Sequence, residues 1–213
     1  MLPAEILATG TQLRAVPLVP EIRLHLADEP FGLWQHIETV SGRDGMDPPF
    51  WAFAWAGGQA LARYLLDHPA AVRGRAVLDV ASGSGLVAIA AALAGAREVT
   101  ACDIDPLAAA AIEVNAAANG TAVRVVCADI LAGDPPSAGL VTAADAFYEQ
   151  ELASQVTGFL DRAAASGAAV LAGDFGRTYL PRTRLAPMAR YDVTGLFALE
   201  GVDAKSTTVW TWV

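Results

Sequence analysis

The chain has 213 residues, a length that suits a single α/β domain with a substantial core. Apolar residues make up 54% of it and charged residues 17%, a balance that argues against long disordered segments. The formal net charge of −9 disfavours nucleic acid as a substrate, because proteins that bind nucleic acids are usually basic.

The sequence contains no segment that would place the protein in or across a membrane. Its apolar runs are interrupted before they reach the roughly 20 residues that a spanning helix needs. Residues 1–5 lack the basic region and apolar segment of a secretory signal. We therefore expect a cytoplasmic protein in which Cys102 and Cys127 are reduced, buried thiols. The spacing of histidines and cysteines predicts no metal site.

Residues 1–213 are predicted to form one domain, with an N-terminal extension at 1–47 and a core at 48–213. Within the extension, residues 21–27 alternate between apolar and polar side chains, which predicts a short strand. Residues 31–47 contain three glycines and are predicted to form a loop. The sequence shows neither an internal repeat nor a linker.

The core opens on an aromatic segment, in which residues 50–55 hold two tryptophans and two phenylalanines. Gly57 and Gly58 follow, and such a pair marks a close approach of the backbone to another group. Residues 59–66 then predict an amphipathic helix that ends near Pro69. Aromatic residues are usually buried for packing, so burial and a ligand-facing role stand as equal alternatives for this segment.

From residue 75 onward, strand and helix patterns alternate. We predict strands at 75–80, 98–103, 122–127, 140–144 and 168–172, and helices at 85–94, 106–119 and 149–165. This order is typical of an α/β, doubly wound, Rossmann-like sheet that is mostly parallel and binds ligands at the carboxyl ends of its strands. Residues 190–197 and 206–213 read as two strands without a helix between them. They predict an antiparallel pair at the edge of a seven-stranded sheet.

A glycine turn joins the first core strand to the helix after it. Gly83 and Gly85 permit a sharp turn and a close approach of a ligand to the backbone. The free N–H groups at the start of the following helix point back at this turn. The glycine spacing also fits a dinucleotide site, with Asp103 about 20 residues further on. Asp79, however, would repel a pyrophosphate and favours a ligand that carries an ammonium group.

The stretch from Asp79 to Gly85 resembles the first motif, D-x-G-x-G-x-G, of the seven-strand S-adenosylmethionine (SAM) methyltransferases. Ala81 replaces the first glycine, a small change because alanine is also small. The resemblance implies SAM as the cofactor. The candidate cofactor-binding residues are Trp55, Gly57, Asp79, Ala81, Gly83, Gly85, Asp103, Ile104, Asp129 and Ile130.

Two acidic residues follow the next two strands. Asp103 is expected to bridge the ribose hydroxyls, as an acidic residue does in dinucleotide-binding folds. Asp105, which precedes a proline, fills the helix-cap role and so leaves Asp103 free for a ligand. Asp129 resembles the methyltransferase residue that accepts the adenine amino group, with Ile130 stacked on the ring. A solvated loop aspartate is the alternative at Asp129.

The fourth core strand ends in a D-x-x-Y pattern formed by Asp145 and Tyr148. It is similar to the motif that follows this strand in the lysine-directed seven-strand methyltransferases. The resemblance implies that both residues are catalytic and contact the acceptor. The alternative is that Asp145 caps the helix after it and Tyr148 packs beneath that helix, and both interpretations can hold together.

Residues 50–65, the D-x-x-Y pattern and residues 173–181 together resemble the electron-transfer flavoprotein β-subunit lysine methyltransferases and the nicotinamide N-methyltransferase-like group beside them. Phe175 stands where that group has proline. The resemblance implies that the acceptor is a lysine of a protein, with the flavoprotein β-subunit as the expected substrate. It adds Trp51 to the residues that bind this substrate.

The expected reaction is an in-line transfer of a methyl group from sulfur to a lysine amine, which is mainly a task of positioning. A lysine arrives protonated because its free pKa is about 10.4. Desolvation beside Trp51, Trp55 and Tyr148 would lower that pKa, and their ring faces would stabilise the alkylammonium product. Asp145 would orient the amine.

Three alternatives to a protein-lysine methyltransferase remain open from the sequence. A small-molecule N-methyltransferase of the nicotinamide type would differ only in its acceptor pocket. An NAD-binding oxidoreductase would need a proton relay, for which Lys205 has no suitable context. A non-catalytic SAM-binding protein is the third. The acidic chain is expected to meet a basic protein segment rather than a nucleic acid or a membrane, and the sequence predicts no oligomeric state.

Overall fold

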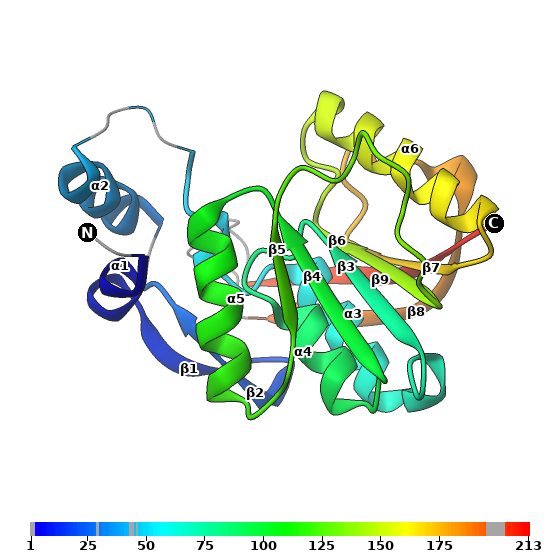
Figure 1. Ribbon diagram of the computed structural model, residues 1–213, viewed down its shortest axis with the longest axis horizontal. Coiled ribbons are helices and arrows are strands. Elements are labelled where there is room, and N and C mark those ends of the chain that lie inside the picture. The colour runs from blue at the N-terminus through cyan, green and yellow to red at the C-terminus, as the bar shows by residue number, and fades with distance from the viewer. Residues whose placement is uncertain (1–2, 29, 43–44, 46, 195–202) are drawn as a thin grey trace.

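A seven-stranded sheet runs through the centre of the computed structural model, with helices on both of its faces (Figure 1). The structure describes residues 3–28, 30–42, 45, 47–194 and 203–213. The strands lie in the order β5-β4-β3-β6-β7-β9-β8. Their bounds are β3 (Ala76–Val80), β4 (Glu98–Asp103), β5 (Arg124–Cys127), β6 (Leu140–Ala144), β7 (Ala169–Asp174), β8 (Leu185–Thr194) and β9 (Ala204–Trp212).

The direction of the strands confirms the predicted mostly parallel sheet with an antiparallel pair at one edge. Strands β3 to β7 pair in parallel, and β9 runs antiparallel to both β7 and β8. Strand β8 begins at Leu185, five residues before the predicted start at 190. Its pairing with β9 is irregular between Pro187 and Ala189, so this first part lacks a regular alternating pattern. The predicted end of that strand, at 195–197, lies outside the described residues.

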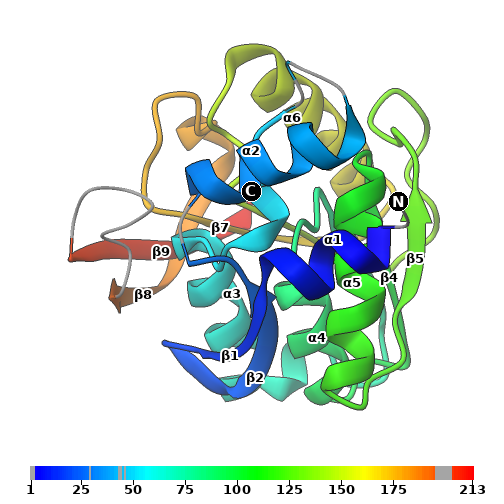
Figure 2. The ribbon, with the colours of Figure 1, turned by 90° about the vertical axis from the view of Figure 1, so that its left-hand side faces the viewer.

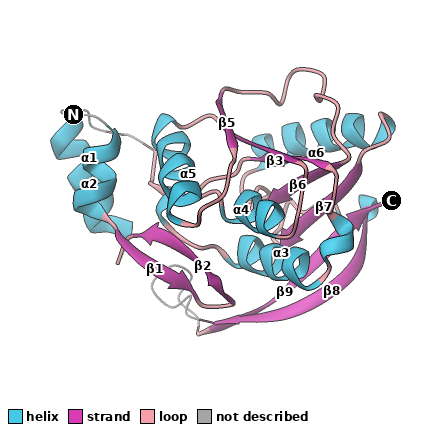
Figure 3. Ribbon diagram, turned by 60° about the horizontal axis from the view of Figure 1, so that its bottom comes forward, coloured by secondary structure: helices cyan, strands magenta, loops and turns pink. Residues whose placement is uncertain are grey.

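The helices of the core pack on opposite faces of the sheet (Figure 3). One face carries α3 (Ala56–Asp67), α4 (Leu86–Leu93) and α5 (Pro106–Ala118), and the other carries α6 (Gln150–Ala165). Both faces bury aliphatic side chains, which is the pattern of a strand covered on two sides. These helices bring the carboxyl ends of the parallel strands to one edge, where the glycine turn also lies.

The predicted burial of both cysteines is wrong for one of them. Cys102 is buried in β4, whereas Cys127 is exposed. Cys127 ends β5, which is the edge strand of the sheet and so has a neighbouring strand on one side only.

The N-terminal segment is more structured than the sequence predicts. Its elements are α1 (Pro3–Gly10), β1 (Gln12–Val16), β2 (Val19–Leu26) and α2 (Pro30–Ser41). Strand β2 confirms the strand predicted near 21–27, and it pairs antiparallel with β1 in a hairpin. The loop predicted at 31–47 is wrong, since most of its described part is helix α2. Leu33 and Ile37 lie one turn apart and are buried together, so tertiary packing outweighs the glycine at position 32.

The hairpin packs directly on the core. Four of its side chains are fully buried, and they pack with Leu86 and Ile89 of α4: Val16, Val19, Ile22 and Leu24. Figure 2 shows α1 lying across α5, with the hairpin below it. The division between an extension and a core at residue 47 stays a prediction. Within the described part of the chain, no helix has the length and apolar character needed to cross a membrane.

Candidate active site

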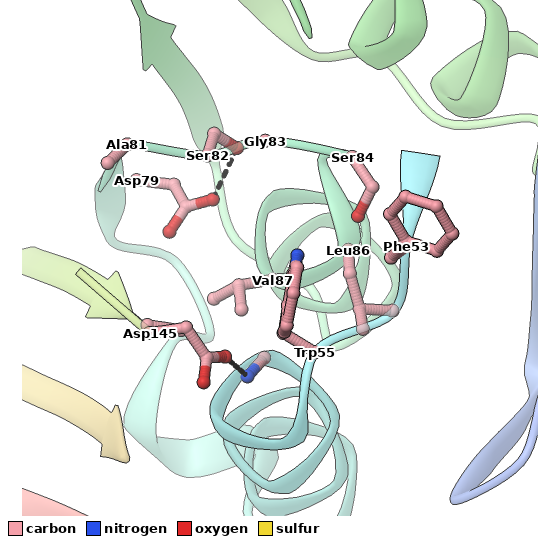
Figure 4. Close-up of a pocket in the computed structure, with 12 residues that line it drawn as sticks. Phe53, Trp55, Asp79, Ala81, Ser82, Gly83, Ser84, Leu86, Val87 and Asp145 are labelled. Atoms are coloured by element: carbon pink, nitrogen blue, oxygen red, sulfur yellow. Dashed lines mark hydrogen bonds between the residues drawn. The ribbon is translucent and has the colours of Figure 1, made fainter. Parts of the chain in front are cut away.

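A pocket opens at the carboxyl edge of the sheet, between the glycine turn and the start of α3 (Figure 4). It holds about 380 Å³ of empty space that is open to solvent. Of the predicted site residues, the pocket is lined by Trp55, Asp79, Ala81, Gly83 and Asp145. Residues from three distant parts of the chain therefore meet in one place, as the topology of the sheet predicts.

The backbone of the glycine turn is left-handed at three positions. Gly83 and Gly85 have φ angles of +54° and +81°, which glycine adopts without steric cost. Ala81 has a φ of +51°, a conformation in which a Cβ is crowded. This left-handed conformation explains why the D-x-G-x-G-x-G motif has glycine at the position that Ala81 occupies here.

Asp79 is a buried acid at the base of the pocket. Its carboxylate accepts hydrogen bonds from the Ser82 hydroxyl at 2.5 Å and from the Thr142 hydroxyl at 2.7 Å. The side chain is 2% exposed, and this burial raises its pKa to about 6. A cationic group beside Asp79 would stabilise its ionised carboxylate, so the pocket favours a positively charged ligand over an anionic one.

Asp103 supports the glycine turn directly. Its Oδ2 accepts from the backbone N–H of Gly83 at 2.8 Å, and its Oδ1 accepts from the N–H of Asp105 at 3.0 Å. Burial raises the pKa of Asp103. The Asp105 side chain accepts from the N–H of Leu107, which confirms Asp105 as the cap of α5. Asp103 therefore already fixes the shape of the turn, a role that the sequence does not predict, and each carboxylate oxygen keeps a further lone pair for a ligand.

The pocket lining does not include the remaining cofactor candidates, which are Gly57, Gly85, Asp103, Ile104, Asp129 and Ile130. Ile104 is 68% exposed just past β4. Asp129 and Ile130 follow β5, the neighbouring strand, and the Asp129 carboxylate accepts from the N–H of Leu131 at 2.9 Å.

Asp145 joins the end of β6 to the start of α3. Its Oδ2 accepts from the N–H of Gly58 at 2.7 Å, and its Oδ1 accepts from the N–H of Gly57 at 3.1 Å. These are first-turn donors of α3, which have no partner within the helix. The alternative that Asp145 caps the helix after it is wrong, since α6 has Glu149 at its N-cap.

Arg177 completes a buried ion cluster that the sequence analysis missed. Its Nη1 lies 2.5 Å from Asp145 Oδ1 and 2.9 Å from Asp174 Oδ2. Burial raises the pKa of Asp145, and the charge of Arg177 opposes that rise. The sequence does show that Arg177 follows Asp174 by three residues at the end of a buried strand. This local spacing does not indicate that Arg177 also pairs with Asp145, 32 residues earlier in the chain.

The aromatic segment divides into a buried and an exposed part. Trp51 is 2% exposed and packs in a cluster with Ile37 and Ala108, and its buried Nε1 has no hydrogen-bond partner among the described residues. Trp51 therefore presents almost no surface to an acceptor. Trp55 lines the pocket, and its Nε1 donates to the carbonyl of Phe50 at 2.8 Å.

Phe50, Trp55 and Tyr148 form an aromatic cluster beside the pocket. The ring centroids of Phe50 and Tyr148 lie 5.5 Å apart, and those of Phe50 and Trp55 lie 6.0 Å apart. Tyr148 is 48% exposed and Phe50 is 42% exposed, so the alternative that Tyr148 packs beneath a helix is wrong. An alkyl amine that entered the pocket past these rings would lose water and meet ring faces.

The protein family and the named proteins that this chain resembles are all methyltransferases. The pattern of the family described as "Ribosomal protein L11 methyltransferase (PrmA)" matches residues 60–172. A protein of Xenopus laevis named "Electron transfer flavoprotein beta subunit lysine methyltransferase" is 38% identical over 217 residues, covering 99% of this chain and 87% of that protein. The protein of the same name from Homo sapiens is 35% identical, covering 91% of this chain and 75% of its own length.

Solved structures support the fold. A ribosomal protein L11 methylase from Lactobacillus delbrueckii subsp. bulgaricus superposes with a TM-score of 0.53 at 23% identity, over 73% of this chain and 78% of its own. Magnesium protoporphyrin IX methyltransferase from Synechocystis PCC 6803, solved with bound SAM, gives 0.53 at 16% identity over the same shares of the two chains. At these identities the likeness concerns the fold alone.

Proposed function

This chain belongs to the electron transfer flavoprotein beta subunit lysine methyltransferase family of SAM-dependent methyltransferases, and we propose that it methylates a lysine of a protein. The observation that carries the proposal is the aromatic cluster of Phe50, Trp55 and Tyr148 beside a pocket that contains a buried acid. Membership in this family removes the NAD-binding oxidoreductase from the alternatives.

The pocket fits SAM by its chemistry. SAM carries positive charge on its sulfur and on its amino group, and Asp79 offers a buried carboxylate whose ionisation a cation would favour. When bound, SAM supplies an activated methyl group on that sulfur. Asp103 would hold the ribose hydroxyls, and Asp129 the adenine amino group. The other residues proposed to contact the cofactor are Trp55, Gly57, Ala81, Gly83, Gly85, Ile104 and Ile130.

At the acceptor side, we propose Asp145 and Tyr148 as the catalytic pair. Asp145 lines the pocket in a fixed orientation because two N–H groups and Arg177 hold its carboxylate. Tyr148 offers a ring face and a hydroxyl at the exposed side of the cluster. Together they would orient the lysine amine, and desolvation against Trp55 and Phe50 would lower the pKa of that amine. Trp51 is proposed to act by supporting this segment from within the core.

The named relatives act on the β-subunit of electron transfer flavoprotein, and we propose the same substrate for this chain. The net charge of −9 would assist the encounter with a basic segment that carries the target lysine. We further propose that the protein works in the cytoplasm and has neither a nucleic acid nor a membrane as its partner.

The proposed acceptor is tested by supplying labelled SAM with either purified flavoprotein β-subunit or nicotinamide. We expect label on a lysine of the flavoprotein, located by peptide mapping, and none in nicotinamide. Label in nicotinamide without label on any flavoprotein lysine would establish the small-molecule alternative instead. The absence of transfer to either acceptor, with tight SAM binding, would favour the non-catalytic alternative.

Replacing Asp103 with alanine is expected to weaken SAM binding about ten- to a hundredfold, because hydrogen bonds to the charged carboxylate are lost. The change also removes the acceptor for the Gly83 N–H and so loosens the turn. Calorimetric titration with SAM measures the effect. Asp105→Ala is the matched control, since Asp105 caps α5 without contacting the turn through its side chain. Equal SAM affinities in the two variants would remove Asp103 from the site.

A further inference from the structure

We propose that Asn115 is a positioning residue for the cofactor site and that it ties the glycine turn to the N-terminal hairpin. Asn115 lies on α5 and is fully buried. Its Nδ2 donates to the carbonyl of Ser84 at 2.8 Å, and its Oδ1 accepts from the N–H of His25 at 2.8 Å. One side chain thus holds two backbone segments that lie far apart in the sequence.

The contact with Ser84 reaches the part of the turn that shapes the pocket. Ser84 lies between the two glycines of the turn, is 6% exposed and lines the pocket. A Cβ built on Gly85 would lie 3.2 Å from Ile112 of the same helix, so α5 packs closely against the turn. Asn115 therefore adds a directed hydrogen bond to an existing packing contact, and together they fix the position of the turn.

The contact with His25 brings the hairpin into this support. Strand β2 lies beside α5, and the backbone N–H of His25 has the Asn115 amide oxygen as its acceptor (Figure 2). An amide has its donor and its acceptor on opposite arms of a rigid plane. Both bonds can form together only when β2 and the turn stand at one fixed separation.

A second buried amide ties the same hairpin to the aromatic segment. Gln59 is 1% exposed, its Nε2 donates to the carbonyl of Ala54 at 2.7 Å, and its Oε1 accepts from the N–H of Leu18 at 3.2 Å. The N–H of Ala27, just after β2, also donates to the carbonyl of Ala52 at 3.0 Å. The hairpin is thus linked to the glycine turn through Asn115, and to the aromatic segment through Gln59 and the Ala52 carbonyl.

Asn119 supplies a matched control on the same helix face, one turn after Asn115. Its Oδ1 accepts from the N–H of Arg23 at 2.9 Å, and its Nδ2 donates to the Arg23 carbonyl at 2.6 Å. Asn119 thus binds the same strand β2 but makes no hydrogen bond to the glycine turn. A residue that only anchors the hairpin should behave like Asn119.

The test compares Asn115→Ala with Asn119→Ala by calorimetric titration with S-adenosylhomocysteine, together with the melting temperature of each protein. We expect both variants to melt at a lower temperature than the wild type. Only Asn115→Ala should weaken binding, by about tenfold, measured well below its melting temperature. If Asn115→Ala does not fold, Asn115→Asp replaces it, because the carboxylate keeps the acceptor for His25 and loses the donor to Ser84.

An Asn115 variant with wild-type affinity, or two variants with equal losses of affinity, would overturn the proposal. The inference rests on the proposed cofactor site but not on the acceptor, and the experiment uses no acceptor. If the wild-type protein fails to bind S-adenosylhomocysteine, the cofactor assignment itself is wrong. If the wild type binds and the variants do not differ, the positioning role alone is refuted.

Discussion

Gly57→Ala is expected to unfold the start of α3, whereas Gly58→Ala leaves the protein folded. A Cβ on Gly57 would lie 2.2 Å from the carbonyl oxygen of Gly173 and 2.7 Å from Asp145 Oδ2. Neither neighbour can yield easily, because one is backbone of β7 and the other is held by Arg177. Overpacking of a well-packed core costs about 1–3 kcal/mol where side chains can shift, and a clash with backbone should exceed that range.

The control at Gly58 differs only in its surroundings. A Cβ there would meet Leu86 at 3.7 Å and Asp145 Oδ2 at 3.8 Å, which are ordinary contacts. Alanine also favours helix over glycine by about 1 kcal/mol, so a small gain is expected. Urea unfolding of both variants measures the difference. Unfolding midpoints that coincide would show that α3 and β7 can separate without loss of stability.

The glycine pair shows what the sequence could and could not predict here. A close approach of the backbone follows from two adjacent glycines, and the structure contains one. The close neighbour of Gly57, however, is not a ligand but the backbone of β7 at Gly173. A Cβ on Gly173 would in turn lie 2.2 Å from the carbonyl oxygen of Gly57. The partner of a close approach is set by tertiary packing, which a local pattern does not contain.

The same limit separates the predicted site residues from one another. The glycine turn and Asp79 are local features of one strand and one turn, and the structure places both in the pocket. Trp51 looks like its neighbour Trp55 in the sequence. It is buried because it packs in one cluster with side chains of α1 and α2, two helices that were not predicted from the sequence. Without these helices, the sequence could not decide between burial and a ligand-facing role for Trp51.

The directions of the strands, in contrast, were predictable because they follow from connectivity. Parallel strands joined by helices give the doubly wound sheet, and a helix-free return gives the antiparallel edge. The ion cluster of Asp145, Asp174 and Arg177 was not predictable in this way. It depends on the register of β6 against β7, which places Ala144 opposite Gly173. This register brings Asp145, just after β6, close to Asp174 at the end of β7, and Arg177 contacts both carboxylates.

Asp145→Ala and Tyr148→Phe are each expected to slow methyl transfer strongly, for different physical reasons. Removing the Asp145 carboxylate leaves two N–H groups of α3 without their acceptor and Arg177 with one fewer counter-charge. Breaking a buried pair in this way costs roughly 3–5 kcal/mol, a large part of the stability of a domain. Asp145→Ala should therefore lose both stability and transfer.

Tyr148→Phe should lose transfer alone. Tyr148 is 48% exposed, and its ring contact with Phe50 survives the loss of the hydroxyl. The urea midpoint and the affinity for S-adenosylhomocysteine should match the wild type. Turnover of the flavoprotein lysine should fall by about a hundredfold, the usual effect of misplacing a reacting group.

The two variants together distinguish positioning from support, because kcat, acceptor KM and stability are measured on the same proteins. A Tyr148→Phe protein with wild-type kcat would reduce Tyr148 to a packing surface for Phe50. An Asp145→Ala protein that unfolds in the wild-type range of urea would mean that Asp174 alone neutralises Arg177 and that the start of α3 needs no cap. Wild-type turnover in both variants would leave the ring faces of the aromatic cluster, and not the Asp145 carboxylate or the Tyr148 hydroxyl, as the groups that orient the lysine.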